Sequence, residues 1–179
     1  MHKDIDRILL TEEQIKCRIA ELGKELMRDY AGKTPVFVGV LKGVVVFYAD
    51  MIRAFDDHCQ LEFMWISSYK GTQSTGNVVV KQDVKTDLTG RHVVILEDIV
   101  DSGRSLQFVV QHLKEKGAAS VRICALLDKP EGRAPGIDIR ADYVGFTIPD
   151  AFVVGYGLDY DEKYRNLPYV GILKPHVYE

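Results

Sequence analysis

The sequence predicts an α/β protein with a central, mainly parallel sheet flanked by helices. Short and nearly continuous apolar segments at residues 35–41, 92–96 and 121–127 have the composition of strands buried on both faces. Segments with helical character alternate with them, and strands that are joined through a helix run parallel in one sheet. The length of 179 residues suits a single domain over residues 1–179.

Three helices are expected, at residues 11–30, 44–55 and 105–116. The first has apolar residues at helical spacing and begins with a capping box, in which the Thr11 hydroxyl caps the helix and Gln14 reaches back to it. Glycines follow the first and third helices and end them. These helices supply the crossover connections of the sheet.

A polar, Gly-rich segment at residues 68–77 has no periodicity and is expected to form a mobile loop. Short strands at residues 61–67 and 78–81 flank this loop. The predicted flexible lid therefore covers residues 67–80.

Two further strands are expected at residues 143–146 and 152–155. The last third of the chain is rich in short segments, Gly and Pro. We expect the N-terminal residues and residues 145–179 to form a small cap, or hood, over one edge of the sheet.

Composition and charge exclude several classes of protein. Hydrophobic residues make up 46% of the chain and charged residues 27%, as in soluble globular proteins. The net charge of −3 argues against a nucleic-acid-binding protein, which is usually basic. Three widely spaced cysteines favour reduced thiols, and no apolar run approaches the roughly 20 residues that span a bilayer. We expect a cytoplasmic protein that binds neither nucleic acid nor membrane.

The most informative segment is residues 93–106, VVILEDIVDSGRSL, at the carboxyl end of a predicted strand, where open α/β sheets bind ligands. Residues 101–105 combine a Gly for a tight turn, two Ser hydroxyls and backbone N–H groups at a helix N-terminus, which suit a phosphate monoester. The acidic pair Glu97-Asp98 would repel phosphate, so it suits vicinal ribose hydroxyls or Mg²⁺. A ligand with a phosphate and a diol is a sugar phosphate.

This segment resembles the phosphoribosyl-pyrophosphate motif of the type I phosphoribosyltransferases. The motif is an apolar run, two acids, two apolar residues, then acid, hydroxyl, Gly, any residue and hydroxyl. Similarity to the hypoxanthine–guanine branch of that family extends over residues 5–175 and implies the type I phosphoribosyltransferase fold. The donor-binding residues that it implies at this segment are Glu97, Asp98, Ser102, Gly103, Arg104 and Ser105.

Two shorter matches concern the donor and the lid. Leu41-Lys42-Gly43 resembles the family's pyrophosphate loop, in which the peptide bond before the Lys is often cis. Ser68-Tyr69 stands at the start of the family's flexible catalytic loop. Taken alone, a Lys-Gly pair after a strand also fits a solvated turn, and a Ser-Tyr pair indicates little. The sequence leaves open whether the bond before Lys42 is cis.

Residues 148–160, IPDAFVVGYGLDY, resemble the family's base-binding segment. The resemblance implies that Phe152 stacks on the purine and that Val153 presents backbone groups to its edge. It places Asp159 near the C2 side of the purine or near a second Mg²⁺. On the residues alone, Phe152 fits a core aromatic as well.

A lysine just past a predicted strand, Lys129, has three donors and no acceptor, so it can bond a purine O6 but mispairs with the amino group of adenine. This would select a 6-oxopurine base, although a lone Lys at this position also fits the protein surface. Arg165 matches the family's pyrophosphate arginine. The sequence does not rank hypoxanthine, guanine and xanthine.

The resemblance implies a purine salvage enzyme that transfers 5-phosphoribosyl from phosphoribosyl pyrophosphate to N9 of hypoxanthine or guanine, giving IMP or GMP. Asp101 is the expected general base, Lys42 and Arg165 would neutralise pyrophosphate, and Ser68 and Tyr69 would close over the transition state. Mg²⁺ is the expected cofactor, and the family implies a homodimer or homotetramer. The candidate metal ligands are Glu97, Asp98 and Asp159.

Other functions fit the sequence less well. Gly32-Lys33-Thr34 resembles the end of a P-loop, but the required first Gly would fall at Met27 inside a predicted helix. No G-x-G-x-x-G follows a strand, and the five His and three Cys lack zinc-ligand spacing. The alternative is a regulatory protein on the same scaffold that binds the sugar donor without turnover.

Overall fold

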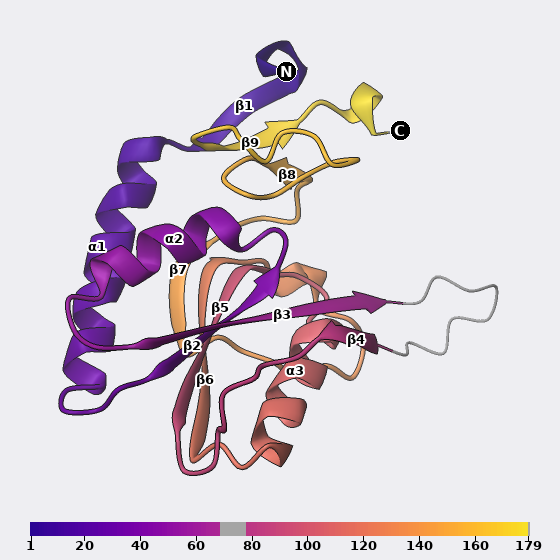
Figure 1. The fold of residues 1–179 in the computed structure, drawn as a ribbon. Coiled ribbons are helices and arrows are strands. Elements are labelled where there is room, and N and C mark those ends of the chain that lie inside the picture. Colours follow the sequence, from indigo (N-terminus) through magenta and orange to yellow (C-terminus); the bar gives the residue numbers. More distant parts are fainter. Residues whose placement is uncertain (69–77, 179) are drawn as a thin grey trace.

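A six-stranded sheet forms the centre of the protein in a computed structural model, which describes residues 1–68 and 78–178 (Figure 1). Its strand order is β4-β3-β2-β5-β6-β7. All neighbouring strands pair in parallel except β4, which lies antiparallel to β3 at one edge. The predicted α/β class is confirmed. The strands are β2 (Val36–Leu41), β3 (Gln60–Ser68), β4 (Val78–Gln82), β5 (His92–Val100), β6 (Ser120–Asp128) and β7 (Tyr143–Thr147).

Helices cover both faces of this sheet. Helices α1 (Glu12–Asp29) and α2 (Val45–Ala54) pack on one face, and α3 (Arg104–Glu115) packs on the other. The predicted capping box is present, since Gln14 N–H donates to the Thr11 hydroxyl and the Gln14 side chain accepts from the Thr11 N–H. Short 3₁₀ turns occupy His2–Asp4, Pro130–Gly132 and Pro175–Val177.

Alternate residues of the central strands pack into two separate hydrophobic cores, one on each face of the sheet. In β2, Phe37 packs in the core under α1 and α2, whereas Val36 and Val38 pack in the core under α3. In β5, Leu96 belongs to the first core and Ile95 to the second. Because strand side chains alternate between faces, a strand buried on both sides needs an unbroken apolar run. This explains why the apolar segments predicted the central strands correctly.

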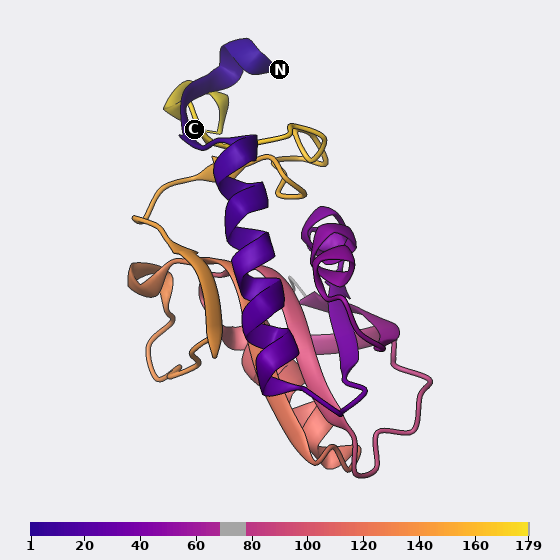
Figure 2. The same ribbon diagram turned by 90° about the vertical axis from the view of Figure 1, so that its left-hand side faces the viewer.

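A second sheet of three strands, in the order β1-β9-β8, lies beyond one end of the main sheet (Figures 1 and 2). Its strands are β1 (Ile5–Leu10), β8 (Val153–Val154) and β9 (Val170–Leu173). The sequence analysis predicted neither β1 nor β9. Half of the six residues of β1 are exposed and two of them are charged. β9 has only four residues, so neither strand carries a clear pattern. Strand β7 stays in the main sheet to Thr147, beyond the expected start of the hood.

Strand β5 is longer than the sequence predicts. It continues to Val100 because its pairing with β6 extends as far as Asp128. The acidic pair Glu97-Asp98 therefore lies inside the strand and not after it. No helix among the described residues is long and apolar enough to cross a membrane.

Candidate active site

The predicted functional residues gather at the carboxyl ends of the three central strands. Lys42 follows β2, Asp98 and Asp101 lie at the end of β5 and just past it, and Lys129 follows β6. These strands are adjacent and parallel, so their ends share one edge of the sheet. This is the edge at which open α/β sheets bind ligands.

The loop after β2 contacts both β5 and the small sheet region. The Leu41–Lys42 peptide bond is cis. A Cβ at Gly43 would collide with the carboxylate of Asp98, and a Cβ at Gly157 would collide with the Gly43 carbonyl. Gly157 also has a φ of 100°, which favours glycine. These close approaches place the predicted pyrophosphate loop directly beside the acidic pair.

The acidic pair Glu97-Asp98 lies in an environment that disfavours the ionised form of both carboxyl groups. Burial, and then repulsion by Asp98, raise the pKa of Glu97 well above its usual range. Burial raises the pKa of Asp98 to about 6, although the Ile99 N–H donates to Asp98 Oδ1 over 2.8 Å. Glu97 Oε2 is buried and has no hydrogen-bond partner in the described part of the chain. A cation or ribose hydroxyls would satisfy both carboxylates.

The described residues contain no group of three His, Cys, Asp or Glu side chains placed to hold a metal ion. Glu97 and Asp98 could therefore supply only some of the ligands of a Mg²⁺ ion. The remaining oxygens would come from the bound substrate or from water. Mg²⁺ commonly binds in this way, through one or two carboxylates together with substrate phosphates.

The start of α3 has the features of an anion-binding helix N-terminus. Gly103 has a φ of 77° and no side chain caps the helix, so its first N–H groups face outward without a side-chain acceptor. A Cβ at Gly103 would meet the side chains of Ile137 and Ile139. Around this turn, the side chains of Ser102, Arg104 and Ser105 are exposed.

Lys129 joins two acids. Its Nζ lies 3.1 Å from Asp101 Oδ1 and 3.1 Å from Asp150 Oδ1, and its side chain is only 12% exposed. Burial alone would lower the pKa of Lys129, but the bonds to Asp101 and Asp150 outweigh it and the pKa is raised. The predicted base selector therefore stays charged and contacts the predicted general base.

Arg133 was not predicted as a site residue from the sequence, yet its side chain bonds to both the loop after β5 and the loop after β6. Its Nη1 donates to the carbonyls of Val100, Asp101 and Lys129 over 2.6, 2.8 and 3.1 Å. Its Nη2 pairs with Asp128 at the end of β6. The only sequence signal is an Arg just past the strand end, in a segment without periodicity.

The second predicted cation of the pyrophosphate subsite, Arg165, is also paired. Its Nη2 lies 2.8 Å from Asp159 Oδ1, and its Nη1 donates to the Gly157 carbonyl over 2.8 Å. A second carboxylate, that of Glu162, lies 3.4 Å from Arg165 Nη2 and 3.2 Å from Lys42 Nζ. Asp159, which is expected near the C2 side of the purine or a second Mg²⁺, contacts this arginine, and its expected role stays a prediction.

Phe152 is not a core residue, since its side chain is 38% exposed. It stacks on Tyr178 with 4.7 Å between ring centroids and meets Tyr160 edge-on at 5.6 Å. The Leu173 N–H donates to the Phe152 carbonyl, so the next pair of opposed residues, Val153 and Ile172, is a non-hydrogen-bonded pair of the antiparallel ladder. The N–H and C=O of Val153 therefore point away from β9, towards the open edge of the small sheet.

The two predicted lid residues lie at the limit of the described part of the chain. Ser68 is the last residue of β3, where its backbone pairs with Val78, and Tyr69 lies outside the described residues. The sequence analysis also assigned no role to Asp150, Glu162 or Tyr178. Asp150 stands inside the recognised base-binding segment and could have been found there, whereas the other two carry no local signal.

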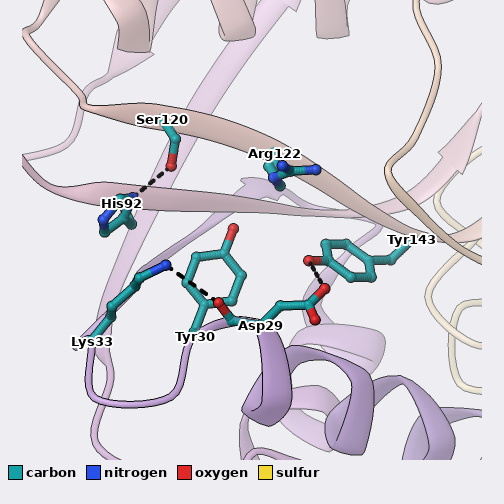
Figure 3. A pocket seen from close by; sticks show the side chains of 7 residues that line it. All are labelled: Asp29, Tyr30, Lys33, His92, Ser120, Arg122 and Tyr143. Atoms are coloured by element: carbon teal, nitrogen blue, oxygen red, sulfur yellow. Dashed lines mark hydrogen bonds between the residues drawn. The ribbon is translucent and has the colours of Figure 1, made fainter.

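A cavity of about 380 Å³ lies at the opposite ends of the strands, away from every predicted site residue (Figure 3). In it, His92 hydrogen-bonds Ser120 over 2.8 Å, and the Tyr143 hydroxyl donates to Asp29 over 2.8 Å. Four of the seven lining side chains thus bond to one another, whereas the buried Tyr30 hydroxyl has no hydrogen-bond partner in the described part of the chain.

Comparisons with known proteins identify the family. The phosphoribosyl transferase domain matches residues 7–161. The chain is 50% identical to the hypoxanthine-guanine phosphoribosyltransferase of Streptococcus pneumoniae strain R6, over 99% of this chain and 98% of that protein. It is 49% identical to the corresponding protein of Bacillus subtilis, over 100% and 99% of the two chains.

The chain is also 49% identical to the bifunctional protein TilS/HprT of Listeria monocytogenes, but it spans only 27% of the length of that protein. Among solved structures, a hypoxanthine phosphoribosyltransferase of Staphylococcus aureus superposes with a TM-score of 0.95 at 48% identity, covering 100% of this chain and 97% of that one. The similarity extends through both sheets and all site segments. The chain therefore belongs to the phosphoribosyl transferase family, within its hypoxanthine–guanine branch.

Proposed function

We propose that the protein transfers 5-phosphoribosyl from phosphoribosyl pyrophosphate to N9 of hypoxanthine or guanine, forming IMP or GMP and pyrophosphate. The observation that carries this proposal is the contact of Lys129 with Asp101, which joins a 6-oxopurine selector to a base at the donor loop. Relatives that are about half identical bear the name of this activity.

The donor fits the site in three parts. The 5′-phosphate is assigned to the start of α3, where Ser102, Ser105 and backbone N–H groups face outward. The ribose hydroxyls are assigned to Glu97 and Asp98. Pyrophosphate is assigned to the loop at Lys42, with Arg165 as the second cation.

The base fits between Phe152 and the end of β6. One face of the purine would stack on Phe152, whose ring already stacks on Tyr178. Its edge would meet the outward backbone groups of Val153, and O6 would accept a bond from Lys129. Adenine carries an amino group in place of O6. The N–H donors of that amino group would face the N–H donors of the Lys129 ammonium, and no hydrogen bond would form.

In the proposed reaction the N9–C1′ bond forms as the bond from C1′ to pyrophosphate breaks. Asp101 accepts the proton from N7 of the purine, and Lys129 keeps that carboxylate oriented. Lys42 and Arg165 neutralise the departing pyrophosphate. Bound Mg²⁺, held by Glu97 and Asp98 with Asp159 near, would add positive charge at the phosphate oxygens.

The lid, the hood, the assembly and the location belong to the same proposal. Ser68 and Tyr69, in a lid at residues 67–80, would exclude water from C1′, a role that rests on the family resemblance. The small sheet would act as the hood that carries the base-binding segment. Exposed apolar side chains on α2, β3 and β4 support a homodimer or homotetramer, and three free cysteines support a cytoplasmic location.

A ³¹P NMR experiment separates transfer from mere donor binding. Phosphoribosyl pyrophosphate and Mg²⁺ are mixed with the protein, first alone and then with hypoxanthine. We expect free pyrophosphate and IMP to appear together, and only after the base is added. Donor that binds but stays intact in the presence of every 6-oxopurine would support the regulatory alternative and reject the enzyme.

A further inference from the structure

One carboxylate contacts both cations that are assigned to pyrophosphate. Glu162 Oε2 lies 3.2 Å from Lys42 Nζ, and Glu162 Oε1 lies 3.4 Å from Arg165 Nη2. The two oxygens thus engage one cation each, although Lys42 and Arg165 are 123 positions apart in the chain (165 minus 42). A pyrophosphate bound at the same two cations would need the same space and the same positive charge.

The backbone around Glu162 holds it in this position. Residues 160–163 form a two-residue turn, in which Tyr160 and Lys163 exchange both backbone hydrogen bonds. Asp161 and Glu162 have φ values of 51° and 58°, a left-handed conformation that turns of this kind usually fill with Asn or Gly. The Glu162 N–H donates to Asp159 Oδ2 over 2.9 Å, so the turn is also tied to the partner of Arg165.

Glu162 contributes little to the fold. Its side chain is 64% exposed, and exposed ion pairs typically add little to stability. The bond from Lys42 lowers the pKa of Glu162, which keeps the carboxylate ionised. A charged residue in a left-handed turn, with both oxygens on a substrate subsite, points to a functional role.

We propose that Glu162 is an internal counter-ion of the pyrophosphate subsite, which occupies Lys42 and Arg165 in the empty enzyme and is displaced when pyrophosphate binds. This inference rests on the proposed function, because it takes the assignment of that subsite from it. Pyrophosphate binds only to molecules in which Glu162 has left the two cations. The apparent affinity for pyrophosphate is therefore reduced in proportion to the fraction of molecules in that state. The return of Glu162 would favour release of the product pyrophosphate.

The chain offers a matched control in the neighbouring residue. Asp161 carries the same charge in the same turn, but among the described residues its side chain pairs only with Lys163, at 3.0 Å, and is 73% exposed. The substitutions Glu162→Gln and Asp161→Asn both remove one negative charge without changing side-chain size. Only the first removes the carboxylate that contacts both cations of the subsite, while Arg165 keeps its pair with Asp159.

The affinity for pyrophosphate is measured by isothermal titration calorimetry with Mg²⁺, on the unsubstituted protein and both variants at equal ionic strength. We expect Glu162→Gln to bind pyrophosphate about 3- to 10-fold more tightly, and Asp161→Asn to stay within about 2-fold of the unsubstituted protein. Thermal unfolding of each variant verifies that it is folded. Product inhibition by pyrophosphate should strengthen in Glu162→Gln by the same factor.

An unchanged or weaker affinity in Glu162→Gln would overturn the inference, and so would an equal gain in both variants, which would indicate a general charge effect. Failure of the unsubstituted protein to bind pyrophosphate would overturn the subsite and the inference together. If only the Glu162→Gln gain appears while no purine is converted, the inference about the anion subsite stands and the proposed transfer reaction fails.

Discussion

The ammonium of Lys129 lies 3.1 Å from Oδ1 of Asp101, so the residue assigned to recognise the base directly contacts the residue assigned to deprotonate it. Asp150 accepts a second bond from the same ammonium. Lys129 has three N–H donors, and a bound purine O6 can take the third without breaking either ion pair. In the proposed function, one side chain would therefore both recognise the base and orient Asp101.

The first prediction concerns Asp101. Replacement by Asn keeps the shape of the side chain but removes the proton acceptor, so kcat should fall by about 10²-fold or more. Binding of phosphoribosyl pyrophosphate, measured by calorimetry, should be nearly unchanged, because the donor phosphate contacts other atoms of the loop. Near-normal turnover would remove Asp101 from the role of general base.

The second prediction is that Lys129 selects the base. In Lys129→Ala, the ratio of kcat/KM for hypoxanthine to that for adenine should fall by about 10-fold or more, because the donor to O6 is lost. Lys163→Ala serves as the control, since Lys163 is exposed and pairs only with Asp161. An unchanged preference in Lys129→Ala would show that selection lies elsewhere.

Arg133 should matter for stability as well as for activity. Its guanidinium and Asp128 are 16% and 17% exposed, so Arg133→Gln leaves a largely buried carboxylate without its partner. We expect the free energy of unfolding in urea to fall by about 3 kcal/mol. Arg140→Gln breaks an exposed pair with Asp138 and should cost less than about 0.5 kcal/mol. Equal losses in the two variants would contradict the role given to Arg133.

The raised pKa of Asp98 predicts how stability depends on pH without Mg²⁺ or donor. Its pKa is near 4 when the chain is unfolded and about 6 when it is folded, so the folded state binds the proton more tightly. The stability that Asp98 contributes is fully present below about pH 4 and is lost as the pH rises through about 6, on the order of 3 kcal/mol. Urea unfolding across this range measures the loss, and Asp98→Asn should make the profile shallower, although Glu97 remains buried and keeps a contribution of the same sign. An unaltered profile in that variant would assign the effect to other groups.

Contiguous patterns in the sequence predicted the main sheet, its helices and the donor loop. Apolar runs marked the strands because both faces of the sheet are buried, and the acids of residues 97–101 follow such a run directly. Contacts between distant segments were not predictable in this way. No local pattern joins Glu162 to Lys42, and Arg133 acts through carbonyl groups that every residue has.

The small sheet was missed for a different physical reason. β1 and β9 pair with each other over a register from Ile5–Leu173 to Leu10–Val170, which joins segments far apart in the sequence. β9 has only four residues and β1 carries two charges, so neither segment shows a strand pattern by itself. The resemblance to the family supplied the roles of Phe152 and Val153. The structure adds the exposed ring of Phe152 and the outward backbone of Val153, which no periodicity indicates.

The central claim, that this site transfers phosphoribosyl to 6-oxopurines, is tested most directly by a comparison of bases. The protein is mixed with phosphoribosyl pyrophosphate, Mg²⁺ and each of hypoxanthine, guanine, xanthine and adenine, and nucleotide formation is followed by absorbance. We predict turnover with hypoxanthine or guanine and little with adenine. No turnover with any base in folded protein, or a preference for adenine, would contradict the account.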